Sequence, residues 1–176
     1  EALWMLKRWN LDKPQIIADL APGDQCVIVD TNNPAELPAG LDGADVIEII
    51  DHHLLAGGIK TRVPINITVR PLACTATIMH DLIGEDMARA PESVKGAMLT
   101  CILSDTLEFR SPTTTAHDRA VAEKLAADLG VNIADYAAEM FAAEGARVAA
   151  LDLHGGDDTV AAVTAAGGEA ISVTAD

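Results

Sequence analysis

Two apolar runs that end in acids decide the fold of this chain: QCVIVD at residues 25–30, and DVIEIID at residues 45–51, which His52 and His53 follow. Both are rich in β-branched residues and apolar at consecutive positions, which is typical of strands buried in a parallel sheet. INITV at residues 65–69 predicts a third strand. The predicted fold class is α/β, with a mainly parallel, twisted sheet flanked by helices.

Helical patterns account for much of the remaining sequence. Leu3, Leu6 and Trp9 have helical spacing, and Pro14 suits the first turn of a second short helix in KPQIIADL, residues 13–20. Further helices are predicted after Ala73, from Pro91 to about Leu103, from the capping threonines of SPTTT to Gly130, and from Ile133 to about Ala149.

The last part of the chain differs in composition. After Arg147 there is no Lys or Arg, and HGGDD precedes two short alternating stretches, TVAAVT and AISVT. We therefore expect one main domain over residues 1–150 and a linker or the start of a C-terminal domain over residues 151–176. The chain opens at Glu1 without an initiator Met, so we expect a fragment of a longer protein.

Composition excludes several function classes. The formal net charge is −15 and aromatic residues make up 3%, so the chain would repel a phosphate backbone and offers few rings on which bases could stack. No apolar stretch approaches the roughly 20 residues of a membrane span. The three cysteines form no CxxC pair and are expected to be buried free thiols. The expected protein is cytoplasmic and binds neither nucleic acid nor membranes.

Polar residues follow two of the predicted strands at the carboxyl ends, where open α/β sheets bind ligands. These are Asp30 and the group Asp51, His52 and His53. Asp105 ends an apolar helix, where the negative end of the helix dipole calls for a positive partner. A metal ion shared by Asp30, His52 and Asp105 would supply that charge, although a loop cap at Asp30 and a solvated Asp105 are the alternatives.

The ligand types indicate which metal is suitable. Carboxylates with one imidazole favour manganese or cobalt, with magnesium tolerated. Adjacent side chains of an extended segment point to opposite sides, so one of His52 and His53 would bind metal while the other faces substrate. Asp51 could hold an imidazole N–H or simply end the strand.

Four motifs occur in this order along the chain: VDTNNPAELP at 29–38, IIDHHL at 49–54, PLACTATI at 71–78 and CILSDTLEFRSPTTTAHD at 101–118. Together they resemble the manganese-dependent (family II) inorganic pyrophosphatases of the DHH phosphoesterase superfamily, over Glu1 to about Ala146. The resemblance implies hydrolysis of diphosphate to two phosphates by a two-metal mechanism, with a metal-bridging water as nucleophile. It also implies two Mn²⁺ ions, with Co²⁺ or Mg²⁺ as alternatives, and a homodimer.

The same resemblance implies roles for individual residues. Asp30 matches the carboxylate that bridges the two metals, and His52 and Asp105 match further metal ligands. His53 matches the histidine that binds and activates the substrate phosphate. Asp51, Thr75 and Ser104 are expected to support the ligands or contact substrate, with helix capping as the alternative for Thr75.

The sequence also departs from the family pattern. Thr31 stands where the family usually has His, Leu54 replaces a common basic residue, and Ala73 replaces a usual Gly. The family's first strand, with its His-x-x-x-Asp-x-Asp ligands, and its C-terminal domain, with substrate-binding Lys and Arg, have no match. His154 and Asp157 reproduce half of that spacing but are expected to lie in a solvated loop. We therefore expect this chain alone to be weakly active or inactive.

Two other functions fit the same residues. One is another DHH phosphoesterase, an exopolyphosphatase or an oligonucleotide or cyclic-dinucleotide phosphodiesterase. The other is a non-catalytic module that binds metal or mediates dimerisation.

Overall fold

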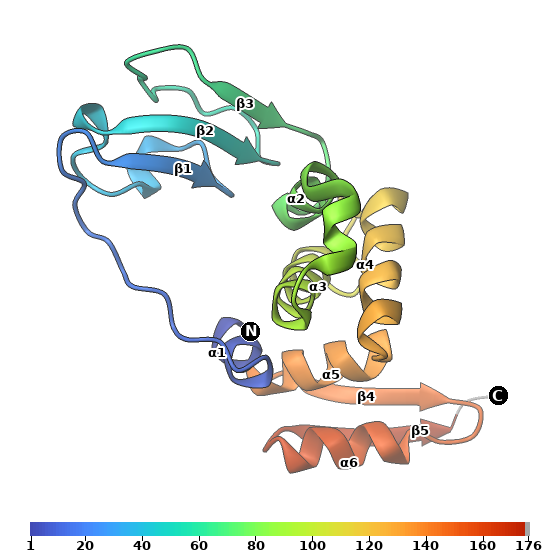
Figure 1. The fold of residues 1–176 in the computed structure, drawn as a ribbon. Helices are drawn as coiled ribbons and strands as arrows, with labels where there is room; N and C mark the ends of the chain where they lie inside the picture. The colour runs from blue at the N-terminus through green and yellow to red at the C-terminus, as the bar shows by residue number, and fades with distance from the viewer. Residues whose placement is uncertain (175–176) are drawn as a thin grey trace.

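A three-stranded parallel sheet forms the first half of the molecule. The computed structural model describes residues 1–174. The strands are β1 (Gln25–Val29), β2 (Asp45–Asp51) and β3 (Asn66–Val69), in the order β1-β2-β3, and both neighbouring pairs are parallel. Helices lie beside this sheet (Figure 1). The predicted α/β class with a mainly parallel sheet and flanking helices is confirmed.

Parallel pairing brings the carboxyl ends of β1 and β2 to one edge of the sheet. Ile28 lies opposite Ile49, and Val29 lies opposite Ile50. Beyond the last pair, the N–H of Asp30 donates to the carbonyl of Ile50 at 3.0 Å. The end of β1 is therefore tied to the end of β2, which positions the residues that follow each strand.

Burial along these strands is uneven. Ile28, Val46 and Ile49 are at most 4% exposed and pack against residues of the surrounding loops. Other apolar strand residues remain 44–59% exposed, namely Val27, Val29, Ile47 and Ile67. The expectation of continuously buried strands is therefore wrong for part of each run, because residues 1–174 do not cover these side chains.

Four helices form the main apolar core. They are α2 (Thr75–Ile83), α3 (Glu92–Thr106), α4 (Ala116–Leu129) and α5 (Ile133–Ala143). Their fully buried members include Leu99, Ile102, Leu103, Leu125 and Met140. The strand arrowheads in Figure 1 point toward α2 and α3, so the carboxyl ends of the strands face this helical layer. Short 3₁₀ helices lie at η1 (Pro34–Glu36), η2 (Leu41–Gly43) and η3 (Gly84–Arg89).

The predicted ends of α4 are confirmed by its caps. The hydroxyl of Thr115 accepts a hydrogen bond from the N–H of Asp118, and the Asp118 carboxylate accepts one from the N–H of Thr115. This reciprocal capping box satisfies two donors that the first helical turn leaves unpaired. Gly130 ends the helix at φ +65°, a left-handed conformation that glycine adopts without steric cost.

Helix α1 (Ala2–Arg8) packs on the helical core through aromatic contacts. The Trp4 and Tyr136 rings meet edge to face at 4.9 Å, and the indole N–H of Trp9 donates to the Tyr136 hydroxyl at 2.7 Å. A Cβ atom at Gly96 would lie 2.0 Å from the Trp9 ring. Glycine at position 96 therefore permits the close approach of α1 to α3.

The predicted helix in KPQIIADL is wrong. No helix occurs between α1 and β1, and this connection is drawn as a long irregular segment in Figure 1. Ile16 is 82% exposed and Ile17 is 56% exposed, so the segment has no buried apolar face. A helix of eight residues or so is too short to be stable without such packing.

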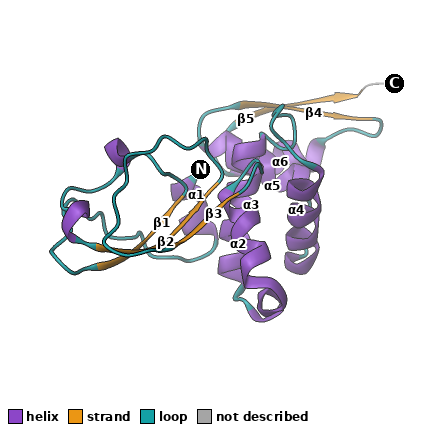
Figure 2. Ribbon diagram, turned by 90° about the horizontal axis from the view of Figure 1, so that it is seen from above, coloured by secondary structure: helices purple, strands orange, loops and turns teal. Residues whose placement is uncertain are grey.

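The C-terminal part forms a β-α-β unit. Helix α5 ends at Ala143, short of the predicted Ala149, and β4 (Arg147–Asp152), α6 (Asp157–Ala165) and β5 (Glu169–Thr174) follow, with β4 and β5 parallel. TVAAVT lies inside α6 despite its alternating pattern. Figure 2 shows these two strands apart from the sheet of β1, β2 and β3. The expected boundary at residue 150 falls within β4 and remains a prediction.

Two further features concern the length of the helices and the cysteines. Within residues 1–174, no helix has both the length and the apolar character needed to cross a membrane. All three cysteines are free, but only Cys74 is buried, whereas Cys26 is partly exposed and Cys101 is exposed. The prediction that all three are buried is therefore wrong, because Cys101 lies on a face of α3 that residues 1–174 leave open.

Candidate metal centre

Asp30 begins the site at the carboxyl end of β1. Its backbone is in the left-handed region, with φ +65°, which is uncommon outside glycine although Asp tolerates it better than most residues. Such conformations cost about 1–3 kcal/mol and cluster at functional sites. This turn brings Asp30 Oδ1 to 3.6 Å from His52 Nε2.

The two histidines lie side by side. Their ring centroids are 4.1 Å apart, and ligand atoms of Asp30, His52 and His53 all lie within 4.8 Å of one another. The expectation that the two side chains point to opposite sides is wrong, because β2 ends at Asp51 and the following backbone is no longer extended strand. The carboxyl ends of β1 and β2 thus present one carboxylate and two imidazoles together.

Each imidazole is oriented through its Nδ1 atom. His52 Nδ1 lies 3.0 Å from the carbonyl oxygen of Leu72, and a carbonyl can only accept, so this nitrogen carries the proton. His53 Nδ1 lies 2.8 Å from Asp51 Oδ1 and donates to it in the same way. In both rings Nε2 is left free, which is the arrangement that second partners impose on metal-binding histidines.

Asp51 is fully buried and accepts several hydrogen bonds. The backbone N–H groups of His52 and His53 donate to Oδ1 at 2.8 and 3.1 Å, and the amide of Asn32 donates to Oδ2 at 2.6 Å. Burial raises the pKa of Asp51, but the hydrogen bonds outweigh it and the pKa lies below its ordinary value. The hydrogen bond to Asp51 and the charges of Asp51, Asp30 and Glu36 raise the pKa of His53, although burial of the ring lowers it.

Asp105 lies outside the group of three. It is the penultimate residue of α3 and is exposed in the described chain. Partial desolvation of its carboxyl, together with the charge of Asp30, keeps its pKa above the ordinary value, although hydrogen bonding with Cys74 and the charges of the two histidines lower it. The charges of Asp30, His52 and His53 therefore act on the Asp105 carboxyl. Ser104 precedes it on α3 and is partly exposed.

An unusual turn follows Asp105. Leu107, Glu108 and Phe109 have φ values of 50°, 53° and 66°, three consecutive left-handed residues without a glycine. The N–H groups of Leu107, Glu108 and Ser111 donate to carbonyls at the end of α3, including Glu108 N–H to Leu103 O at 2.9 Å and Ser111 N–H to Thr106 O at 2.8 Å. The N–H of Phe109 donates to the hydroxyl of Thr106 at 3.3 Å. No propensity signal in the sequence predicts this turn, which stops α3 directly after the candidate ligand.

Sequence reasoning missed Asp118, which joins two of the motifs. Its buried carboxylate accepts from the hydroxyl of Thr77 at 2.7 Å, from the N–H of Ala73 at 3.1 Å and from the hydroxyl of Thr115 at 2.6 Å. Burial raises its pKa, but these donors outweigh burial and lower it. Thr75 lies between Ala73 and Thr77 in the sequence and is buried. Its hydroxyl has no hydrogen-bond partner within the described chain. The capping-box spacing was the available signal for Asp118.

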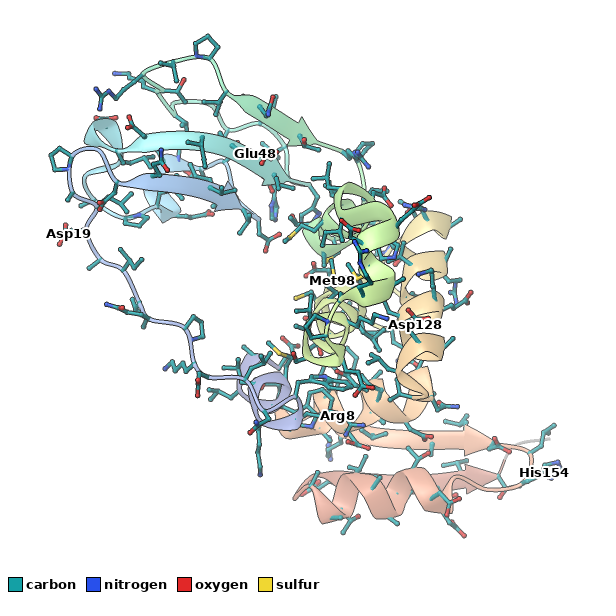
Figure 3. The ribbon with its side chains drawn as sticks, viewed as in Figure 1. Arg8, Asp19, Glu48, Met98, Asp128 and His154 are labelled. Atoms are coloured by element: carbon teal, nitrogen blue, oxygen red, sulfur yellow. The ribbon has the colours of Figure 1, made fainter. Side chains whose placement is uncertain are left out.

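Other candidate features lie away from this cluster. A cavity of about 1030 Å³ lies between α5, β4, the loop before α6 and the turn after α3, and no residue of β1 or β2 lines it. His154 is on that loop, at the opposite end of the molecule from the sheet (Figure 3). The volume of this cavity therefore does not mark the site that the chemistry indicates.

Comparison with known proteins places this geometry in a family. The family model described as DHH family, N-terminal domain, matches residues 2–106, which include Asp30 and the Asp51-His52-His53 group. The chain belongs to the DHH family. Its fold resembles the crystal structure from Methanococcus jannaschii that is assigned to the family II inorganic pyrophosphatases, with a TM-score of 0.73, 30% identity, and coverage of 81% of this chain and 49% of that one.

Several similar proteins are each named "probable manganese-dependent inorganic pyrophosphatase". The DHH chain is 39% identical to such a protein of Deinococcus radiodurans over 146 residues and 35% identical to one of Lactobacillus acidophilus over 144 residues. These matches cover 82% and 81% of this chain but 46% of each relative. The chain thus spans about half the length of these relatives.

Proposed function

We propose that this DHH chain is part of an enzyme that hydrolyses inorganic diphosphate to two phosphates with manganese. The observation that carries the proposal is the group of Asp30, His52 and His53 at the carboxyl ends of two parallel strands. The relatives that bear the manganese-dependent pyrophosphatase name support the choice of substrate and metal. Because the chain spans about half of them, the activity belongs to the whole protein.

The donor set suits the proposed metal. Carboxylate oxygen and imidazole nitrogen both bind manganese and cobalt, and no thiolate is in the group of three. Asp30 and His52 would hold the ion, and Asp105 would add a second carboxylate. When bound, a pair of such ions would neutralise charge on the substrate and lower the pKa of a water molecule.

The protein's own residues would orient the substrate. Asp51 holds His53 through Nδ1, so Nε2 is left free and can donate to a phosphate oxygen when the ring is protonated. The raised pKa of His53 favours that protonated form. Thr75 and Ser104 would line the side of the site formed by α2 and α3. With a net charge of −15, the chain needs metal ions to bind an anionic substrate.

The remaining expectations are part of the same proposal. Residues 1–150 would form a partial catalytic domain and residues 151–176 a linker or the start of a C-terminal domain. The protein would be a cytoplasmic homodimer that binds neither nucleic acid nor membranes. A sedimentation experiment that finds only monomer at high concentration would contradict the dimer.

Phosphate release from diphosphate by the full-length protein in the presence of Mn²⁺ tests the function. Asp30→Asn keeps the shape of the proposed ligand and should lower the rate at least ~10³-fold, as losses of residues that act directly on the reaction do. Asp12→Asn, at an exposed position away from the site, is the control and should leave the rate unchanged.

A substrate panel separates the rivals. Cleavage of a cyclic dinucleotide or an oligonucleotide without cleavage of diphosphate would favour another DHH phosphoesterase. Manganese binding with no hydrolysis of any substrate would favour the non-catalytic module.

A further inference from the structure

Asn32 carries a buried side-chain amide beside the proposed metal centre. It lies in the loop after β1 and is 6% exposed. Its Nδ2 group donates to Asp51 Oδ2 at 2.6 Å and to the carbonyl of Leu54 at 3.0 Å, while its Oδ1 accepts from the N–H of Ala56 at 2.7 Å. One side chain from the β1 loop thus binds three points of the segment that carries the histidines.

The bond from Asn32 to Asp51 determines which oxygen faces His53. Asp51 is 0% exposed, and its Oδ2 is used by Asn32, so Oδ1 is the oxygen that accepts from His53 Nδ1 at 2.8 Å. Asp51 precedes the histidines in the chain, whereas Leu54 and Ala56 follow them, and Asn32 bonds to all three residues. Asn32 therefore restrains the chain on both sides of His53.

We propose that Asn32 is a positioning residue that, through Asp51, holds His53 in the tautomer with Nδ1–H and leaves Nε2 free toward Asp30 and His52. This inference rests on the proposed function and deepens it. Asn32 itself touches neither metal nor substrate in this arrangement.

Only an amide meets all three demands at this position. A carboxylate at position 32 would place a second buried negative charge 2.6 Å from Asp51 Oδ2. An apolar side chain of equal size would leave Asp51 Oδ2 and the N–H of Ala56 without partners in a buried place, which is costly. Asn supplies the donor and the acceptor from one planar group.

Two measurements on the 176-residue chain test the proposal without measuring hydrolysis. In the metal-free Asn32→Leu variant, imidazole ¹⁵N spectra at a pH where the rings are neutral should show His53 as a mixture of tautomers, whereas the unsubstituted chain should show only the Nδ1–H form. Asp51 also accepts the backbone N–H of His52, a proposed metal ligand, at 2.8 Å. By titration calorimetry, the variant should therefore bind Mn²⁺ about 10–100-fold more weakly, the range seen when second partners of metal ligands are removed.

The control separates positioning from a general loss of stability. Asn132 is also an asparagine that bonds to a backbone N–H, but it caps α5, away from the site. Asn132→Ala should lower stability while leaving both the His53 tautomer and the Mn²⁺ affinity unchanged. Asn32→Asp should fold less well at neutral pH and should not restore the tautomer.

Two results would overturn the proposal. The first is an Asn32→Leu variant with the His53 tautomer unchanged, whatever its stability. The second is Mn²⁺ affinity within twofold of the unsubstituted chain. If the unsubstituted chain binds no Mn²⁺, the tautomer alone decides, so failure of the pyrophosphatase assignment is distinguishable from failure of this one.

Discussion

Asp118 offers the sharpest test of how the motifs are held together. Asp118→Ala removes a buried carboxylate that accepts four hydrogen bonds, from the N–H and hydroxyl of Thr115, the N–H of Ala73 and the hydroxyl of Thr77. Leaving the last two donors unpaired costs about 1–3 kcal/mol each, and the lost cap about 1 kcal/mol. We expect the free energy of unfolding to fall by about 3–7 kcal/mol.

Asp118→Asn should be milder and should isolate the charge. Its Oδ1 can still accept from Ala73 and Thr115, and its Nδ2 can donate to Thr77, whose hydroxyl can turn to accept. We expect a loss of about 1–2 kcal/mol, the difference between a charged and a neutral acceptor. Urea denaturation followed by the fluorescence of Trp4 and Trp9, which pack on the helical core, measures both values.

The pH dependence provides a second readout. Because the pKa of Asp118 is lowered in the folded state, its ionisation stabilises the fold above the ordinary Asp pKa of about 4, and this contribution is lost as pH falls through the lowered value. The gap between the unsubstituted chain and Asp118→Asn should therefore close in acid. An alanine variant within 1 kcal/mol of the unsubstituted chain, or a constant gap down to about pH 2.5, would refute the reasoning.

Three further outcomes follow from the same structure. Asp30→Asn should weaken Mn²⁺ binding at least about tenfold by calorimetry, and unchanged affinity would remove this residue from the ligand set. Gly96→Ala places a Cβ atom 2.0 Å from the Trp9 ring, so α1 should shift, stability should fall by about 1–3 kcal/mol, and Trp emission should move to longer wavelength. In the native chain a thiol reagent should label exposed Cys101 well before buried Cys74, as peptide mass spectrometry would show, and equal labelling would contradict the burial pattern.

The strands, the helix caps and most ligand types were predictable from the sequence because their signals are local. β-Branched runs mark β1 and β2, and the spacing of Thr115 and Asp118 marks the start of α4. Acids and histidines directly after two parallel strands indicate a site at one sheet edge. These signals depend on neighbours a few residues apart, so no tertiary information is needed to see them.

Other features depended on which distant surfaces meet. KPQIIADL has helical spacing but buries no face. Helix α5 ends at Ala143, and β4 begins to pair with β5 at Arg147. The sequence showed His52 and His53 as neighbours, but not that their rings lie side by side.

The contribution of Asn32 was also invisible in the sequence, because its partner Asp51 is nineteen residues away. The sequence by itself determined the three strands β1, β2 and β3 and the chemical types at the candidate site. Only the tertiary structure decided how those groups face one another, since the orientation of a buried polar side chain is set by the donors and acceptors that folding brings to it.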